Sequence, residues 1–523
     1  MKNKKTYKLA VLLFFVIYLV VGLSIFKDYG ISWDEQLQRK IGAWSLRYIL
    51  LGDTDLFLFP DRHYGPFFEM VLIVIEMAFN LTNNLRALFL MRHFVTFLLF
   101  FTSTIFFYLL CKDKFSSWKL GLLGTLFLIL NPRIFAHSFY NSKDIAFLAM
   151  FIISVYTLFA YLKSKKIYMA VFHGLASAIL IDIRIVGLLV PLFTCMFTVG
   201  DIVLLKMNKR GRTHAILNFI VYFGVFLPFM VLFRPLLWSD TLGNLTRIFL
   251  EMKSYPISYP MLYMGKSIVS KDLPWHYIPV WIAISTPLIY LAGFIVGVFF
   301  IVKYFFKAPT MFYSESKLDL ISLLWFFLPL ISVIGLRSAM YDAWRHMFFI
   351  YPALTMISLS GLVYLFRYLK SKSVVRNRIL KFTFISIISA GLSTTTYFMI
   401  RYHPFQNVYF NTLAGRDMSR VGERFELDYW GLSYKQALEY ILKNDKDENI
   451  KVCAHTPPGL SNVLILPTDK SKRLSFVFDE NDAKYLLTNY RFNKGDYPYE
   501  EYYSIKVKRA RILGVYKIGD KRA

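Results

Sequence analysis

Long runs of apolar residues recur along this chain, and they constrain its fold more strongly than any other feature of the sequence. The first run, residues 9–26, contains no charged side chain. As an α-helix it would be about 27 Å long, close to the thickness of the hydrocarbon core of a bilayer. A bilayer is the natural solvent for several such helices. The sequence therefore predicts an α-helical polytopic membrane protein.

We assign eleven of these runs as membrane-spanning helices. Composition agrees with this number, because 56% of the residues are hydrophobic and only 18% are charged, against about 25% charged residues in soluble domains. The predicted spans are residues 9–26, 89–111, 120–137, 145–162, 168–182, 185–205, 215–233, 277–302, 319–336, 347–366 and 382–400.

The distribution of charge predicts how the helices are oriented. Lysine and arginine number 61 and aspartate and glutamate 34, so the formal net charge is +27. In a soluble chain this excess would suggest nucleic acid. Here the basic residues gather before the first span and after each even-numbered span, where the positive-inside rule places cytoplasmic loops. We therefore expect a protein of the inner (plasma) membrane with a cytoplasmic N-terminus and no nucleic-acid partner.

The N-terminal run is interpreted as an uncleaved anchor, since it is long and lacks a small-residue cleavage site. The three cysteines, Cys111, Cys195 and Cys453, lie far apart. They form neither a disulfide pattern nor a metal-binding spacing. We expect no metal ion and no cofactor.

Two domains are predicted. Residues 1–402 form the transmembrane domain, with two long external loops at 27–88 and 234–276. In the first loop, residues 36–50 fit an amphipathic surface helix and 66–80 a short, partly inserted helix. Residues 403–523 lack long apolar runs and predict a small extracytoplasmic α/β domain, with a helix at 433–443 and strands at 450–454, 483–488 and 503–516.

Asp34 and Glu35 are the first candidate site residues, because this acid pair follows directly after the first span. Tyr29 and Trp33 would place the pair at the membrane interface, where free carboxylates are costly. The pattern favours a general base that takes a proton from an acceptor hydroxyl or amine. The alternative is that both are solvated loop acids.

Asp144 begins a predicted span, where the helix dipole alone would favour an acid. Arg345 and His346 open another span on the external side. An arginine at a helix start is unfavourable for the helix dipole. It suits a phosphate, which a guanidinium binds with two parallel hydrogen bonds. The alternative is that the arginine side chain snorkels to the membrane interface. Arg184 could instead pair with Asp182 at a helical hairpin, and Lys266 could be a solvated loop lysine.

Five segments together resemble the C-type (GT-C) membrane glycosyltransferases, and in particular the bacterial relatives of the dolichyl-phosphate-mannose protein mannosyltransferases. The resemblance covers most of the chain. The segments that carry it are Asp28–Glu35, Asn131–Asp144, Leu273–Trp281, Tyr341–His346 with Tyr351-Pro352, and Phe425–Tyr434.

The resemblance implies transfer of a hexose or pentose from a polyprenyl-phosphate-linked donor to a lipid, glycan or protein acceptor, with inversion at the anomeric carbon. It implies that Asp34 is the base, Glu35 completes the acid pair and Asp144 is the second-loop acid. It also implies that Arg345 meets the carrier phosphate, with His346, Arg184 and Lys266 as further phosphate-binding groups. The chain lacks the extra lumenal domain of the eukaryotic enzymes, which leaves the acceptor open.

Two other classes of function remain. A transporter or flippase of lipid-linked saccharides should carry mid-span acids or Gly/Pro breaks in symmetric halves, whereas these acids lie at span ends. A non-catalytic envelope assembly protein would work through residues 403–523, and deleting that domain would separate it from an enzyme.

Overall fold

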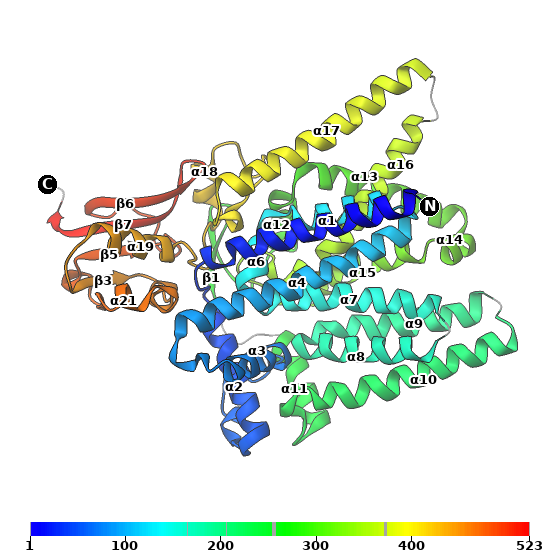
Figure 1. Cartoon of the computed structure of the whole chain (residues 1–523), viewed down its shortest axis with the longest axis horizontal. Helices are drawn as coiled ribbons and strands as arrows, with labels where there is room; N and C mark the ends of the chain where they lie inside the picture. The colour runs from blue at the N-terminus through cyan, green and yellow to red at the C-terminus, as the bar shows by residue number, and fades with distance from the viewer. Residues whose placement is uncertain (1, 165, 206, 254–257, 371–373, 522–523) are drawn as a thin grey trace.

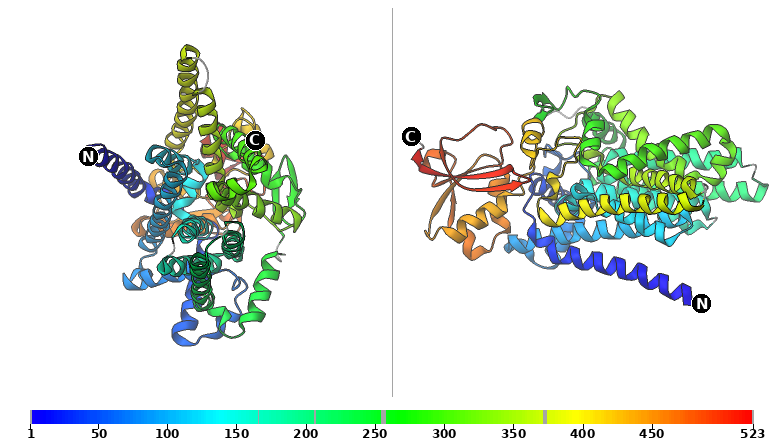
Figure 2. Two further views of the ribbon diagram at one scale, coloured as in Figure 1. Left: turned by 90° about the vertical axis from the view of Figure 1, so that its right-hand side faces the viewer. Right: turned by 90° about the horizontal axis from the view of Figure 1, so that it is seen from above.

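Long helices run side by side and form an elongated body, and a small sheet caps one end of it (Figure 1). The computed structural model describes residues 2–164, 166–205, 207–253, 258–370 and 374–521. We call the capped end the sheet end and the opposite end, where the N-terminus lies, the far end. The right-hand view of Figure 2 shows the sheet projecting beyond the helices along the long axis.

The helices of the body confirm a polytopic membrane protein. Among the described residues, nine helices are long and apolar enough to cross a membrane. The long helices are α1 (Lys2–Ile25), α4 (Leu85–Phe115), α7 (Asp144–Lys163), α9 (Leu189–Leu204), α10 (Lys209–Leu232), α13 (Leu288–Lys307), α15 (Lys317–Gly335), α16 (Tyr351–Lys370) and α17 (Val374–Arg401). A further apolar helix, α8 (Ile167–Ile183), has 17 residues and matches the predicted span 168–182.

The predicted span 120–137 is wrong as one straight helix. It divides into α5 (Trp118–Ile129) and α6 (Pro132–Tyr140), which meet at an angle of 72°. The Asn131 side chain accepts a hydrogen bond from the Ile134 N–H at 3.1 Å, and Pro132 occupies the first position of α6. Asparagine and proline at these positions start a new helix, so the chain turns here.

The predicted span 277–302 is likewise divided, into α12 (Tyr277–Ser285) and α13 (Leu288–Lys307). Pro287 separates them. Thr286 precedes this proline and has an extended backbone, with φ −101° and ψ 138°, as steric contact with a following proline favours. The apolar run continues through the break, which is why periodicity alone did not reveal it.

Glycines allow α13 and α16 to pack closely. A side chain at Gly361 would place its Cβ 2.0 Å from the Gly293 carbonyl oxygen, and one at Gly297 would lie 2.1 Å from the Ile357 carbonyl oxygen. In membrane helices, small residues at such spacings let backbones approach within van der Waals distance. This contact fixes α16 and so positions the residues that precede it.

Both predicted helices of the first loop are confirmed, as α2 (Glu35–Leu51) and α3 (Phe67–Ala78). α3 carries two acids on an otherwise apolar helix, and Arg92 of α4 pairs with both: with Glu69 by a short contact and with Glu76 at 3.0 Å. Because all three side chains are buried, removing one would leave a costly unpaired charge. The pairs therefore hold α3 against the helical body.

The second loop is more ordered than the sequence predicted. It contains α11 (Thr241–Lys253) and an antiparallel hairpin of β1 (Pro260–Tyr263) and β2 (Lys266–Val269). The hairpin joins the segment after α17, since Tyr263 forms a β-bridge with Phe425.

The C-terminal sheet has strand order β4-β3-β5-β7-β6. Strand β3 is parallel to β4 and β5, and the other neighbours are antiparallel. The strands are β3 (Ile450–Ala454), β4 (Leu474–Phe476), β5 (Tyr485–Thr488), β6 (Tyr499–Val507) and β7 (Ala510–Lys521), and the main helices of this region are α18 (Met418–Arg424) and α19 (Tyr434–Asn444).

The helix at 433–443 and the strands at 450–454 and 483–488 are confirmed in position. The single strand predicted at 503–516 is wrong, because β6 and β7 form a hairpin with a turn at Lys508 and Arg509. Both turn residues have positive φ, 46° and 74°. Hairpin turns of this kind usually contain Asn-Gly, so two basic residues gave no turn signal.

Candidate active site

The loop that follows α1 is held by the C-terminal region. The Asn462 side chain accepts a hydrogen bond from the Ile31 N–H at 2.8 Å and donates one to the Ile31 carbonyl at 3.0 Å. A Cβ at Gly30 would meet the Asn462 amide oxygen at 2.3 Å, so a glycine is needed for this approach. The Tyr29 hydroxyl donates to Gln406 at 3.0 Å. These contacts fix the loop just before Asp34.

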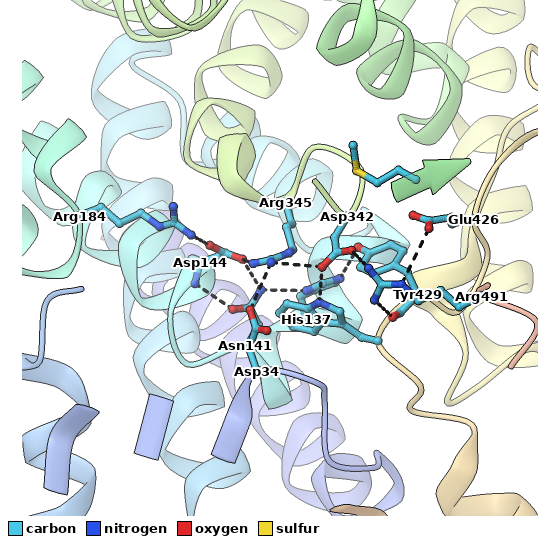
Figure 3. A network of polar contacts seen from close by, with 12 residues as sticks. Asp34, His137, Asn141, Asp144, Arg184, Asp342, Arg345, Glu426, Tyr429 and Arg491 are labelled. Atoms are coloured by element: carbon cyan, nitrogen blue, oxygen red, sulfur yellow. Dashed lines mark hydrogen bonds and ion pairs between the residues drawn. The ribbon is translucent and has the colours of Figure 1, made fainter. Parts of the chain in front are cut away.

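Arg345 lies at the centre of a cluster of charges at the sheet end (Figure 3). Its guanidinium is fully buried and contacts three carboxylates: Asp144 at 3.0 Å, Asp34 at 3.2 Å and Asp342 at 3.2 Å. The ring of Trp430 lies 4.7 Å from the guanidinium carbon. Three acids around one buried cation make Arg345 the group that holds the cluster together.

Asp342 links this cluster to the C-terminal sheet region. Its carboxylate accepts from Arg345 and also from Arg491 at 2.6 Å. Arg491 stacks on the ring of Trp33, 4.7 Å from its centre, next to Asp34 in the chain. Asp342 and Ala343 both have positive φ, 57° and 62°, a costly backbone for residues other than glycine. Strain of this kind persists where surrounding contacts enforce it, and it is common at functional sites.

The carboxylate of Asp144 has three partners within the protein. It contacts Arg345 and Arg184, the latter by a short ion pair, and accepts a hydrogen bond from the Asn141 amide at 3.0 Å. The Asn141 oxygen accepts from the Asp144 N–H at 2.9 Å in return. The alternative of a pair between Arg184 and Asp182 is not the arrangement found, since Asp182 lies beside Arg234, 3.5 Å away.

The structure separates the two acids of the first loop. The Asp34 side chain is 19% exposed and contacts Arg345, whereas that of Glu35 is 2% exposed. Glu35 accepts a hydrogen bond from the Ser32 N–H at 2.9 Å and lies 2.9 Å from His93 Nε2. The Glu35 side chain thus turns back to the backbone just before α2, where Asp34 is the N-cap residue. Glu35 is therefore held by contacts within the protein, and Asp34 is the more exposed of the two acids.

Lys143 is a further cation beside this cluster. Its amine is buried and lies 3.2 Å from the centre of the Tyr64 ring. Burial, with the nearby Arg184 guanidinium, lowers the pKa of Lys143 to about 7, although Asp34 and Asp144 act in the opposite direction. An anion arriving here would favour the charged amine.

A pocket of about 120 Å³ opens beside Arg184 and His346. Its lining includes Val186, which is 40% exposed, so the pocket reaches the surface of the protein. Most of the other lining side chains are apolar: Phe147, Ile183, Ile185, Val333, Met340, Met347 and Phe349. The pocket thus combines two arginines, Arg184 and Arg234, with a largely apolar lining.

Lys266 lies apart from the other predicted site residues. It is exposed at the start of β2, in a hairpin whose Gly265 N–H donates to the Arg424 carbonyl at 3.0 Å. Among the described residues, the structure shows no contact between Lys266 and the Arg345 cluster. Conversely, Asp342, Trp430 and Arg491 belong to the cluster although the sequence analysis gave them no role.

The fold and the site define a polytopic membrane protein with a buried carboxylate–guanidinium cluster at one end of its helices. No protein-family model matches the chain, and no curated protein matches it.

The solved structures that are similar to it over nearly its whole length include two of ArnT. ArnT from Cupriavidus metallidurans bound to undecaprenyl phosphate has 12% sequence identity and a TM-score of 0.47, covering 97% of this chain and 98% of that one. The apo state of ArnT from the same organism has 12% identity and a TM-score of 0.45, covering 97% of each chain.

Proposed function

We propose that this protein is an integral-membrane glycosyltransferase that moves a sugar from a polyprenyl-phosphate-linked donor to an acceptor in the envelope. The observation that supports this most directly is the position of Asp34. Its partly exposed carboxylate belongs to one connected set of charges with Arg345, Asp144 and Arg184, and Arg184 lines the apolar-walled pocket. A base, a phosphate site and a lipid-facing wall therefore adjoin one another, as transfer from a lipid phosphate requires.

In this proposal the donor enters through the pocket with its prenyl chain against the apolar wall. The phosphate lies near Arg184, whose buried Nε–H has no hydrogen-bond partner among the described residues and is available to a phosphate oxygen. His346 and Lys143 lie close by and add donors. Arg345 already contacts three carboxylates, so we assign it to holding Asp34 in position instead of to direct phosphate binding.

The reaction is a single displacement. Asp34 takes the proton from an acceptor hydroxyl as that oxygen attacks the anomeric carbon. The bond from the anomeric carbon to the phosphate oxygen breaks, and the electron pair leaves with the lipid phosphate. Arg184 and Lys143 stabilise the charge that develops on this leaving group. Attack opposite the leaving group inverts the anomeric centre.

The orientation follows from the distribution of basic residues. We propose a cytoplasmic N-terminus, so that the sheet end and Asp34 lie outside the inner membrane. A phosphatase that is active only outside the cytoplasm, fused after Ala523, should be active in intact cells. An inactive fusion, with a cytoplasmic reporter active at the same point, would reverse the orientation.

The function is tested with purified full-length protein and a set of polyprenyl phosphates that carry radiolabelled hexoses or pentoses. An envelope extract supplies the acceptor. We expect label to leave one of these donors and to appear in the extract, with an equal amount of polyprenyl phosphate formed. If every donor stays intact while the protein still moves donor across a bilayer, the protein is a flippase and not a transferase.

Arg184→Ala should weaken donor binding roughly 10- to 100-fold, because it removes a charged hydrogen bond to the phosphate. Arg184→Lys should restore part of the affinity, since lysine keeps the charge but lacks the planar fork. Binding of the labelled donor to purified protein measures both. Arg47→Ala is the matched control, because Arg47 is an exposed arginine of α2 that pairs with Asp53. Equal donor affinity in wild type and Arg184→Ala would exclude Arg184 from the phosphate site.

A further inference from the structure

A second and larger pocket lies between α18, the segment after it, and the C-terminal sheet. Its volume is about 450 Å³, within the range of small-molecule sites. We infer that this pocket binds an anionic saccharide, which is the acceptor of the proposed transfer. The inference rests on the proposed function, and it names the substrate class that the function leaves open.

Most of the side chains that line this pocket are polar, and positive side chains outnumber negative ones. Five cations, Arg491, Lys494, Lys506, Arg509 and Arg511, face four acids, Glu423, Glu426, Asp428 and Glu501. Burial raises the pKa of Glu426 to about 7, so this acid is partly protonated at neutral pH and repels an anion less. Hydroxyl groups of a sugar can bond to the carboxylates and its anionic group to the cations.

Among the cations that line the pocket, Arg509 is the one most available to a ligand. It lines the pocket at the turn between β6 and β7. The structure shows no ion pair and no hydrogen bond of Arg509 within the described part of the chain. By contrast, Arg511 pairs with Glu501 at 2.8 Å, and Lys494 donates to the Gly422 carbonyl.

The backbone of this turn supports the same conclusion. Lys508 and Arg509 both have positive φ, a conformation that favours glycine or asparagine at these positions. A strained position filled by a long basic side chain is a reason to look for a function there. Lys508 does not line the pocket, and its amine lies 5.1 Å from the centre of the Phe398 ring.

The inner wall of the pocket adjoins the Asp34 cluster. Arg491 lines the pocket and donates to Asp342, which in turn contacts Arg345, the partner of Asp34 (Figure 3). The Nε–H of Arg491 is buried without a hydrogen-bond partner in the described residues, so it can donate to a ligand oxygen. A saccharide anchored at Arg509 would therefore extend toward the side of the molecule that carries the base.

Binding to purified full-length protein tests the inference by isothermal titration. The probes are glucose 1-phosphate, glucuronate, glucose and inorganic phosphate. We expect both anionic sugars to bind about tenfold or more tightly than glucose, the value of one charged hydrogen bond, and more tightly than inorganic phosphate. Equal binding of glucose and the anionic sugars would overturn the assignment of an anion. Equal binding of inorganic phosphate and glucose 1-phosphate would show a simple phosphate site, such as one for a lipid head group.

Two glycine variants of the turn provide the matched comparison. Arg509→Gly and Lys508→Gly each remove one positive charge, and glycine accepts the positive φ of both positions, so both variants should fold. We expect Arg509→Gly to weaken binding of glucose 1-phosphate about tenfold or more and Lys508→Gly to change it less than about twofold. Equal losses in the two variants would mean that the turn contributes only its general charge, and the pocket assignment would be wrong.

Experiment can reject the acceptor pocket and the transferase activity independently of each other. Sugar transfer from a polyprenyl donor without saturable binding of the anionic probes would overturn the acceptor pocket and leave the transferase intact. Binding that depends on Arg509, in a protein that releases sugar from none of the donors, would overturn the transferase and leave an anionic-saccharide site.

Discussion

Asp34→Asn should nearly abolish sugar transfer while the purified protein keeps its affinity for the donor. Asparagine has nearly the same shape as aspartate but does not accept the acceptor's proton, and loss of a general base typically costs about 10²–10⁴-fold in rate. Asp34→Glu should retain little activity, because the added methylene displaces the carboxylate by about 1 Å. Single-turnover transfer at saturating donor measures the effect on the chemical step alone.

Glu35→Gln is the matched control, since it changes the neighbouring acid in the same way. Glutamine still accepts the hydrogen bond from the Ser32 N–H that Glu35 accepts at 2.9 Å, so we expect activity close to that of wild type and at most a modest loss of stability. The opposite result, with Glu35→Gln inactive and Asp34→Asn active in transfer, would make Glu35 the base. Full activity in both variants would contradict the proposed role of this loop.

Arg345→Ala should destabilise the protein by about 3–5 kcal/mol, the typical cost of breaking a buried ion pair. Arg345 is fully buried and contacts Asp34, Asp144 and Asp342. Without it, these three carboxylates lose their shared partner. Thermal or denaturant unfolding of the protein in detergent measures the loss, and activity should fall with it because Asp34 is no longer held in place.

A second substitution separates a structural role of Arg345 from direct binding of phosphate. If Arg345 mainly balances the acids, adding Asp144→Asn to Arg345→Ala should recover part of the stability, since one unpaired charge is removed. Arg47→Ala on the surface should change stability by less than about 0.5 kcal/mol. Normal stability of Arg345→Ala together with lost donor binding would instead place Arg345 at the phosphate, as the sequence resemblance implies.

Much of the membrane part could be predicted from the sequence, because a bilayer admits few solutions for an uncharged run of some twenty residues. Each of the eleven predicted segments is helical. The two breaks were missed although Asn131-Pro132 and Thr286-Pro287 are visible in the sequence, since apolar composition continues across both and conceals the change of direction.

The site was predicted in part. Asp34, Asp144, Arg184 and Arg345 stand out as charges at the ends of apolar segments, and the structure brings them together. Arg491 has no such signal, because it lies in a polar region where an arginine is ordinary. The separate roles of Asp34 and Glu35 were nevertheless open to prediction. Ser32 and Glu35 are three residues apart before a predicted helix, a spacing at which a glutamate can turn back to accept from the earlier backbone N–H.

The dependence of the cluster on Arg491 has a consequence for how the protein is made. Asp34 and Arg491 are 457 positions apart (491 − 34), and the residues that link them are synthesised in order. At about 5–20 residues per second, roughly 20–90 s pass between the two. During that time the nascent chain already presents its membrane helices to lipid, but its charge network is incomplete. We therefore expect the proposed transfer activity to begin only after Arg491 has been synthesised and has paired with Asp342.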